Sequence, residues 1–149
     1  MEVYRITKTR YADSLVASGG AARWNERGHF VIYTAASRAL ACLENVVHRS
    51  GEGLQDDFRV MLIHIPDSLP IQTISLDQLP ADWLAPESYP TCQILGHDWL
   101  RQGKPAVLRV PSAIILNESN YLINPYHPDF GQIRLLGHEP FLFDSRLKK

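Results

Sequence analysis

A strand followed directly by a helix is the strongest pattern of hydrophobic and polar residues in this chain. His29–Thr34 is rich in β-branched and aromatic residues and follows a turn signal at Gly28, which predicts a strand. A helix is predicted over Arg38–His48, with Thr34 or Ser37 as the residue whose side-chain oxygen caps its first turn. The face that packs on the core is marked by Leu40, Leu43 and Val47, which recur at helical spacing.

Glu44 lies at the edge of that apolar face. At about 100° per residue it is only about 40° from Leu40 around the helix. An ionised carboxylate next to a core is costly unless it is paired, so the position requires an explanation. In a structural interpretation it pairs with His48 or with a buried arginine, Arg5 or Arg23. In a functional interpretation it is a catalytic carboxylate at the floor of a pocket.

The remaining predicted elements are short. Strands are expected at Val3–Ile6, Phe58–Ile65, Ile71–Ile74, Ala106–Val110, Ala113–Leu116 and Tyr121–Asn124, and Phe141–Phe143 is expected to end the fold. A second helix is predicted over Thr91–Gln102, with its buried side formed by Ile94, Leu95, Trp99 and Leu100. A helical turn is expected at Asp13–Ser18, a connection at Ser50–Asp57, and brief turns between the prolines of 80–90.

Together these elements predict an α+β fold. We expect one domain over residues 1–149, with a bent mixed sheet of roughly six to eight short strands and two main helices. A chain of 149 residues is long enough for a real core, because proteins of this size bury about 68–70% of their unfolded surface.

Composition argues against several classes of protein. A net charge of -1 gives no basic surface of the kind that nucleic-acid binding requires, and 45% hydrophobic residues are ordinary for a globular protein. No apolar run approaches about 18 residues, and the N-terminal residues lack the apolar segment of a signal peptide, so we expect a cytoplasmic protein without a membrane segment. Cys42, Cys92 and His97 have no ligand-like spacing, so no metal site is predicted.

Three polar side chains outside the helix are candidates for a pocket. Arg23 lies in a polar loop and suits a phosphate, since its planar guanidinium can bind two oxygens; the alternative is a surface arginine stacked on Trp24. Arg5 either points into a pocket from the first strand or lies in water at an edge. Ser112 follows Pro111 at a bend, where its hydroxyl is either presented to a pocket or bonded to its own turn.

The order of these residues resembles the RES domain family. The resemblance rests on Gly-x-x-x-Arg-Trp-Asn at 19–25, on a strand ending in Tyr-Thr, and on a helix with Ala-x-x-Glu and a His four residues later. Further matches are Leu-Arg-Val-Pro-Ser at 108–112, Asn-Tyr-Leu-Ile-Asn-Pro-x-His-Pro at 120–128 and Phe-Asp-Ser-Arg at 143–146. The resemblance spans nearly the whole chain, from Tyr4-Arg5 to Arg146.

The resemblance implies a toxin of a bacterial toxin-antitoxin pair with a fold like that of ADP-ribosyltransferases. Such proteins consume NAD as a substrate, so no cofactor is implied. The arginine, glutamate and serine of the family name fall on Arg23, Glu44 and Ser112, and Arg5 and Tyr33 join the pocket. Thr91 is an alternative source of the pocket hydroxyl.

In this interpretation Glu44 stabilises the oxocarbenium-like state formed when the nicotinamide-ribose bond breaks, and the arginines hold the pyrophosphate. Tyr33 lies against the nicotinamide or ribose, and Ser112 orients Glu44 or the nicotinamide amide. The acceptor of the ADP-ribosyl group is left open between water, phosphate and a protein. The implied partner is an Xre-type helix-turn-helix antitoxin, through which alone the chain would meet DNA. The alternatives are a protein ADP-ribosyltransferase with a specific target and a non-catalytic nucleotide-binding module.

Overall fold

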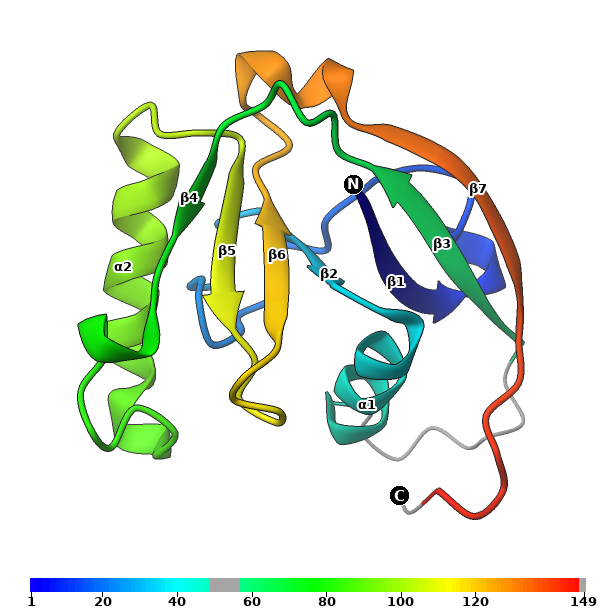
Figure 1. Ribbon diagram of the computed structural model, residues 1–149, viewed down its shortest axis with the longest axis horizontal. Coiled ribbons are helices and arrows are strands. Elements are labelled where there is room, and N and C mark those ends of the chain that lie inside the picture. Colours follow the sequence, from blue (N-terminus) through cyan, green and yellow to red (C-terminus); the bar gives the residue numbers. More distant parts are fainter. Residues whose placement is uncertain (49–56, 148–149) are drawn as a thin grey trace.

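The protein is described here by a computed structural model, which covers residues 1–48 and 57–147. Its strands form one sheet in the order β4-β5-β6-β2-β1-β3-β7 (Figure 1). The strands are β1 (Glu2–Lys8), β2 (Ile32–Ala35), β3 (Phe58–His64), β4 (Ile71–Thr73), β5 (Val107–Pro111), β6 (Ser119–Ile123) and β7 (Arg134–Phe141). Neighbouring strands are antiparallel, except that β4 and β5 are parallel. The predicted α+β fold with a mixed sheet and two main helices is confirmed.

The sheet is weakly joined in its middle. β1 and β2 pair only at Tyr4 and Ala35, whereas β1 and β3 stay in register from Glu2↔His64 to Lys8↔Phe58. The sheet therefore bends and opens between β1 and β2. Figure 1 shows α2 alongside the β4, β5 and β6 half and α1 below the junction of the two halves.

Helix α1 spans Arg38–His48, as predicted, because its start is fixed by a local cap. The hydroxyl of Ser37 accepts a hydrogen bond from the backbone N–H of Leu40 at 3.1 Å, which satisfies one free donor of the first turn. Leu40 is buried against β1 and β3 residues, but the prediction that Val47 belongs to the same buried face is wrong, since Val47 is 59% exposed. The last turn of α1 borders a cleft instead of the core.

Helix α2 spans Tyr89–Arg101 and begins two residues before the predicted start, since a proline is tolerated in the first turn of a helix. Its buried residues are Cys92, Gly96 and Trp99. The predicted burial of Ile94 is wrong, because this side chain is 60% exposed. A Cβ atom at Gly96 would lie 1.8 Å from the carbonyl oxygen of Trp24, so the helix packs its smallest residue against the loop before β2.

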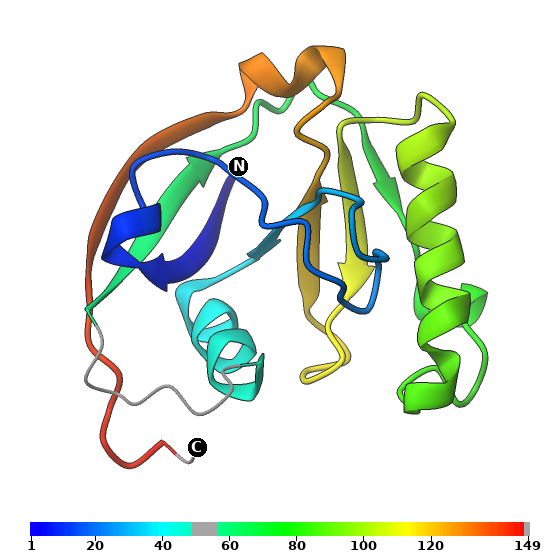
Figure 2. The same ribbon diagram turned by 180° about the vertical axis from the view of Figure 1, so that it is seen from behind.

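That loop crosses the back of the sheet over β2, β6 and β5 (Figure 2). It shortens the strand predicted over His29–Thr34, which begins only at Ile32. The carbonyl oxygen of His29 instead accepts a hydrogen bond from the Asn25 side chain at 2.8 Å. Asn25 also donates to Gly20, so one buried amide holds both ends of the loop.

Other local predictions fail for identifiable reasons. The strand predicted over Ala113–Leu116 is a turn, because the Ser112 hydroxyl accepts the backbone N–H groups of Ile114 and Ile115. The helical turn predicted at Asp13–Ser18 is absent from that segment, and a 3₁₀ turn lies at Thr9–Tyr11 instead.

Strand β7 spans Arg134–Phe141, but the sequence analysis predicts only the segment that starts at Phe141. Of the predicted connection Ser50–Asp57, only Asp57 belongs to the part of the chain that the structure describes. In the same part, no helix has the length and apolar character needed to cross a membrane.

Candidate functional site

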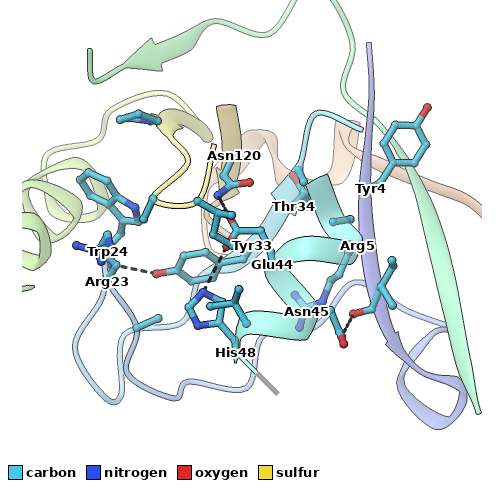
Figure 3. A pocket seen from close by; sticks show the side chains of 18 of the residues that line it. Tyr4, Arg5, Arg23, Trp24, Tyr33, Thr34, Glu44, Asn45, His48 and Asn120 are labelled. Atoms are coloured by element: carbon cyan, nitrogen blue, oxygen red, sulfur yellow. Dashed lines mark hydrogen bonds and ion pairs between the residues drawn. The ribbon is translucent and has the colours of Figure 1, made fainter. Parts of the chain in front are cut away.

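A cleft of about 590 Å³ lies where the two halves of the sheet separate. Its walls come from β1, β2, α1, the loop before β2, the first residue of α2 and the residues around the end of β5 (Figure 3). Four of the five predicted site residues line it: Arg5, Arg23, Tyr33 and Glu44. The fifth, Ser112, lies behind Glu44 and is completely buried.

Glu44 points into the cleft from α1, with its side chain 20% exposed. Its oxygen Oε2 accepts hydrogen bonds from Ser112 Oγ at 3.1 Å and from Asn120 Nδ2 at 2.5 Å, and its Oε1 lies 3.3 Å from His48 Nε2. Burial would raise the pKa of Glu44, but the hydrogen bonds from His48, Asn120 and Ser112 together hold this pKa below its ordinary value. The carboxylate is therefore ionised at neutral pH.

The predicted pairing of Glu44 with His48 is present, but a buried bridge to an arginine is not. Among the residues that the structure describes, neither Arg5 nor Arg23 lies within ion-pair distance of this carboxylate. A structural network of Glu44 and the two arginines therefore does not explain the site.

Of the two alternatives that the sequence left open for Ser112, the structure shows the second, in which the hydroxyl is bonded to its own turn instead of facing the cleft. Its hydroxyl oxygen accepts the backbone N–H groups of Ile114 and Ile115 at 3.0 and 3.1 Å. Since those two lone-pair positions are used, its single hydrogen is left to donate to Glu44. The alternative hydroxyl, that of Thr91, belongs to an exposed residue in the first turn of α2 and does not line the cleft.

Tyr33 lies along one wall of the cleft with its hydroxyl turned to the loop before β2. The hydroxyl donates to Asn25 Oδ1 at 2.5 Å and accepts from the backbone N–H of Trp24 at 3.2 Å. Burial, the largest cause, and the nearby Tyr89 raise the pKa of Tyr33 far above its ordinary value, although the bond from Trp24 opposes them. Tyr33 is thus a neutral phenol that fixes the loop carrying Arg23.

Arg23 is held by aromatic neighbours, but not by the predicted Trp24. Its guanidinium lies 4.5 Å from the ring centre of Tyr89 and 5.2 Å from that of Trp83, and Nη1 donates to the Trp83 carbonyl oxygen at 2.7 Å. The guanidinium also interacts with the Cys92 thiol, where it partly offsets the rise in the thiol pKa that burial causes. Trp24 itself packs in the apolar cluster beneath α2.

Arg5 reaches the cleft from β1, through the opening between β1 and β2. Within residues 1–48 and 57–147, no hydrogen-bond acceptor or acid pairs with its guanidinium. Burial lowers the pKa of Arg5 from its ordinary value. An arginine that is mostly buried and lacks a protein partner is suited to bind an anion.

Two asparagines complete the cleft and were not predicted as site residues. Asn120, at the start of β6, donates to Glu44, and Asn45 on α1 donates to the Ile6 carbonyl oxygen at 3.2 Å. In the sequence, Asn120 is marked only as the first residue of the motif at 120–128, and the motif does not indicate that this side chain contacts Glu44. The described residues contain no cluster of ligands for a metal ion.

Comparison with known proteins identifies the family and several relatives of this chain. A sequence model of the RES domain matches residues 2–144. A protein named Toxin Res from Photorhabdus laumondii is 36% identical over 154 residues, covering 100% of this chain and 98% of that protein.

Two further relatives cover most of both chains. The Prs ADP-ribosylating toxin of a Sphingobium species is 37% identical over 145 residues, covering 94% of this chain and 90% of that protein. A Toxin Res of Pseudomonas putida is 38% identical over 156 residues, covering 99% of both chains. This chain belongs to the RES domain family.

Proposed function

We propose that this chain is a toxin that breaks the nicotinamide-ribose bond of NAD, which it consumes as a substrate in the cleft. The observation that carries the proposal is that one cavity contains both an ionised carboxylate, Glu44, and an arginine, Arg5, that has no partner among the described residues. NAD presents the matching charges, because its pyrophosphate is anionic and its reacting ribose becomes cationic.

The chemistry assigned to Glu44 is electrostatic. When the bond breaks, the nicotinamide nitrogen keeps the electron pair and leaves as a neutral ring, and positive charge develops at the ribose carbon. A carboxylate fixed beside that carbon stabilises the charge where it appears. An acceptor oxygen or nitrogen then attacks the carbon and releases its proton.

The two arginines differ in what they offer the pyrophosphate. Arg5 has all its donors free of the described protein groups, so it can bind two oxygens as a fork. Arg23 keeps one donor on Trp83 and its faces against Trp83 and Tyr89, so its guanidinium is fixed in orientation before a ligand arrives. Tyr33 supplies a flat neutral wall for the nicotinamide or ribose.

The proposal has two forms, which differ in the molecule that accepts the ADP-ribosyl group. Water or phosphate would make the chain an NAD-degrading enzyme, whereas a protein side chain would make it an ADP-ribosyltransferase. The name of the Sphingobium relative, an ADP-ribosylating toxin, supports the second form. Control by an Xre-type helix-turn-helix antitoxin rests on the family resemblance, and action in the cytoplasm rests on the lack of a long apolar segment in the sequence.

The deciding experiment measures free nicotinamide after purified, antitoxin-free protein is incubated with NAD. Water, phosphate and cell extract are offered in turn as acceptor, with Glu44→Gln as the inactive variant and Glu139→Gln as a matched control on β7, outside the cleft. We expect nicotinamide from the wild type and Glu139→Gln. NAD left intact under all three conditions would refute the enzyme, and binding of NAD without release would favour a non-catalytic module.

A further inference from the structure

The two oxygens of Glu44 have different surroundings. Oε2 accepts two hydrogen bonds from inside the protein, from Ser112 Oγ at 3.1 Å and Asn120 Nδ2 at 2.5 Å. Oε1 lies 3.3 Å from His48 Nε2, on a side chain that is 66% exposed at the cleft. The first oxygen is thus fixed by donors that cannot move away, and the second is free to exchange an exposed partner for a bound molecule.

The position of Asn120 is fixed by strands on both sides of it. It belongs to an interior strand, where its backbone is in register with Ala35 on β2 and with Val110 on β5. Since an ionised carboxylate only accepts hydrogen bonds, the amide must turn its NH₂ group to Glu44. Its oxygen Oδ1 is then buried without a partner among the described residues, which is unfavourable and indicates that the N–H donor is what this position requires.

A neutral donor has an advantage over a cation at this place. A lysine or arginine beside Oε2 would hold the carboxylate but would also cancel the charge that stabilises an oxocarbenium-like state. The titratable side chains facing the same cleft are Tyr4, Arg5, Arg23, Tyr33, His48 and Tyr89, and of these only His48 contacts Glu44 within the described chain.

We propose that Asn120 is a positioning residue that, together with Ser112, fixes Oε2 of Glu44 and thereby directs Oε1 at the reacting ribose. This inference rests on the proposed function, since it assigns the geometry of the same carboxylate. In this proposal Asn120 acts on the reaction through its hydrogen bond to Glu44.

The test replaces Asn120 by alanine and follows nicotinamide release against pH. With one donor lost, Glu44 holds its charge less well, so the acid limb of kcat/KM should move to higher pH by about one unit. When Glu44 is no longer held in a fixed orientation toward the ribose, kcat should fall about 10- to 100-fold, with little change in KM. Asn124→Ala is the matched control, because Asn124 directly follows the same strand and its buried side chain, within the described chain, bonds only the backbone N–H of Tyr126.

Asn120→Asp keeps the size of the side chain and covers the case in which the alanine variant does not fold. It places a second carboxylate beside Glu44, so the acid limb should move further than in Asn120→Ala. An acid limb that stays in place in both variants, with activity per folded molecule unchanged, would overturn the proposal and leave Asn120 a structural residue.

A titration without turnover separates this proposal from the proposed function. The side-chain carboxyl carbon of Glu44 can be followed by ¹³C NMR against pH in the wild type and in Asn120→Ala, with no NAD present. A midpoint that rises in the variant supports the positioning of Glu44 even when NAD is not cleaved. An unchanged midpoint overturns the positioning role even when NAD cleavage is confirmed.

Discussion

Replacing Glu44 by glutamine tests the cleft most directly, because it removes a charge and keeps size and shape. The glutamine oxygen can still accept from Ser112 and Asn120, while its NH₂ group takes the place of Oε1 and meets His48, whose neutral ring can accept. The loss of a preorganised electrostatic group of this kind lowers kcat by about 100- to 1,000-fold.

The structure also limits the effect of this substitution on stability. Stranding the buried partner of an ion pair costs about 3–5 kcal/mol, but the His48 side chain is 66% exposed, so it can be solvated by water when the pairing is lost. What remains is the exchange of charged for neutral hydrogen bonds at Oε2, which we expect to cost about 1–2 kcal/mol. For a chain of this length that cost lowers the melting temperature by about 2–8 °C.

The pH dependence of this stability difference has a definite sign. The folded protein lowers the pKa of Glu44 below the ordinary value of 4.5, so folding favours the ionised form. The contribution of Glu44 is therefore fully present above about pH 4.5 and is lost as the pH falls through the lowered pKa. The gap in melting temperature between wild type and Glu44→Gln should narrow along the same acid range.

The assay pairs nicotinamide release with thermal melts of the same samples, again with Glu139→Gln as the control. Activity is expressed per folded molecule, so that loss of fold and loss of chemistry are read separately. A Glu44→Gln protein that melts far earlier than expected yet keeps its activity per folded molecule would contradict the reasoning and remove Glu44 from the catalytic residues.

Three further substitutions have distinct expected effects. Arg5→Met should raise KM for NAD about 10- to 150-fold without lowering the melting temperature, because it removes an unpaired buried charge; an unchanged KM would exclude Arg5 as a ligand of the pyrophosphate. Tyr33→Phe should cost about 1–3 kcal/mol in chemical denaturation, since Trp24 and Asn25 lose their hydrogen-bond partner; full stability would argue against that role. Gly96→Ala should destabilise the fold, because its Cβ would clash with the Trp24 carbonyl oxygen, and should raise KM, because the loop before β2 that carries Arg23 must then move. A crystal structure of the variant with this loop in its original place would contradict the expectation.

Elements whose limits are set by nearby residues could be predicted from the sequence. Helix α1 has its predicted bounds because Ser37 caps it within its own first turn, and β3 closely matches its predicted span because Pro66 follows it. β7 could not be predicted in this way. It contains Gly137 and Pro140, which weaken a local strand pattern, and the residues of β3 with which it pairs lie 70 to 83 positions earlier in the chain.

The candidate site shows the same division between local and distant causes. Helical periodicity places Glu44 at the edge of the buried face, where its charge requires an explanation. The donors that satisfy it, Ser112 and Asn120, lie 68 and 76 residues away, and no local pattern indicates that they meet. The family resemblance supplied Ser112, but the contact of Asn120 emerges only when β6 is placed between β2 and β5.

The cleft contains a carboxylate, Glu44, and two arginines, Arg5 and Arg23, whose charges do not neutralise one another because they are not paired together. If Arg5 or Arg23 paired with Glu44, the carboxylate would be neutralised and the pyrophosphate would have to break an ion pair in order to bind. Instead, neutral donors from Ser112 and Asn120 hold Glu44, and aromatic faces with a backbone carbonyl hold Arg23. Arg5 stays unpaired among the described residues. Under the proposed function, the negative charge of Glu44 is thus kept for the ribose and the positive charge of Arg5 for the phosphates, so that each charge is available to the part of the dinucleotide that it would stabilise.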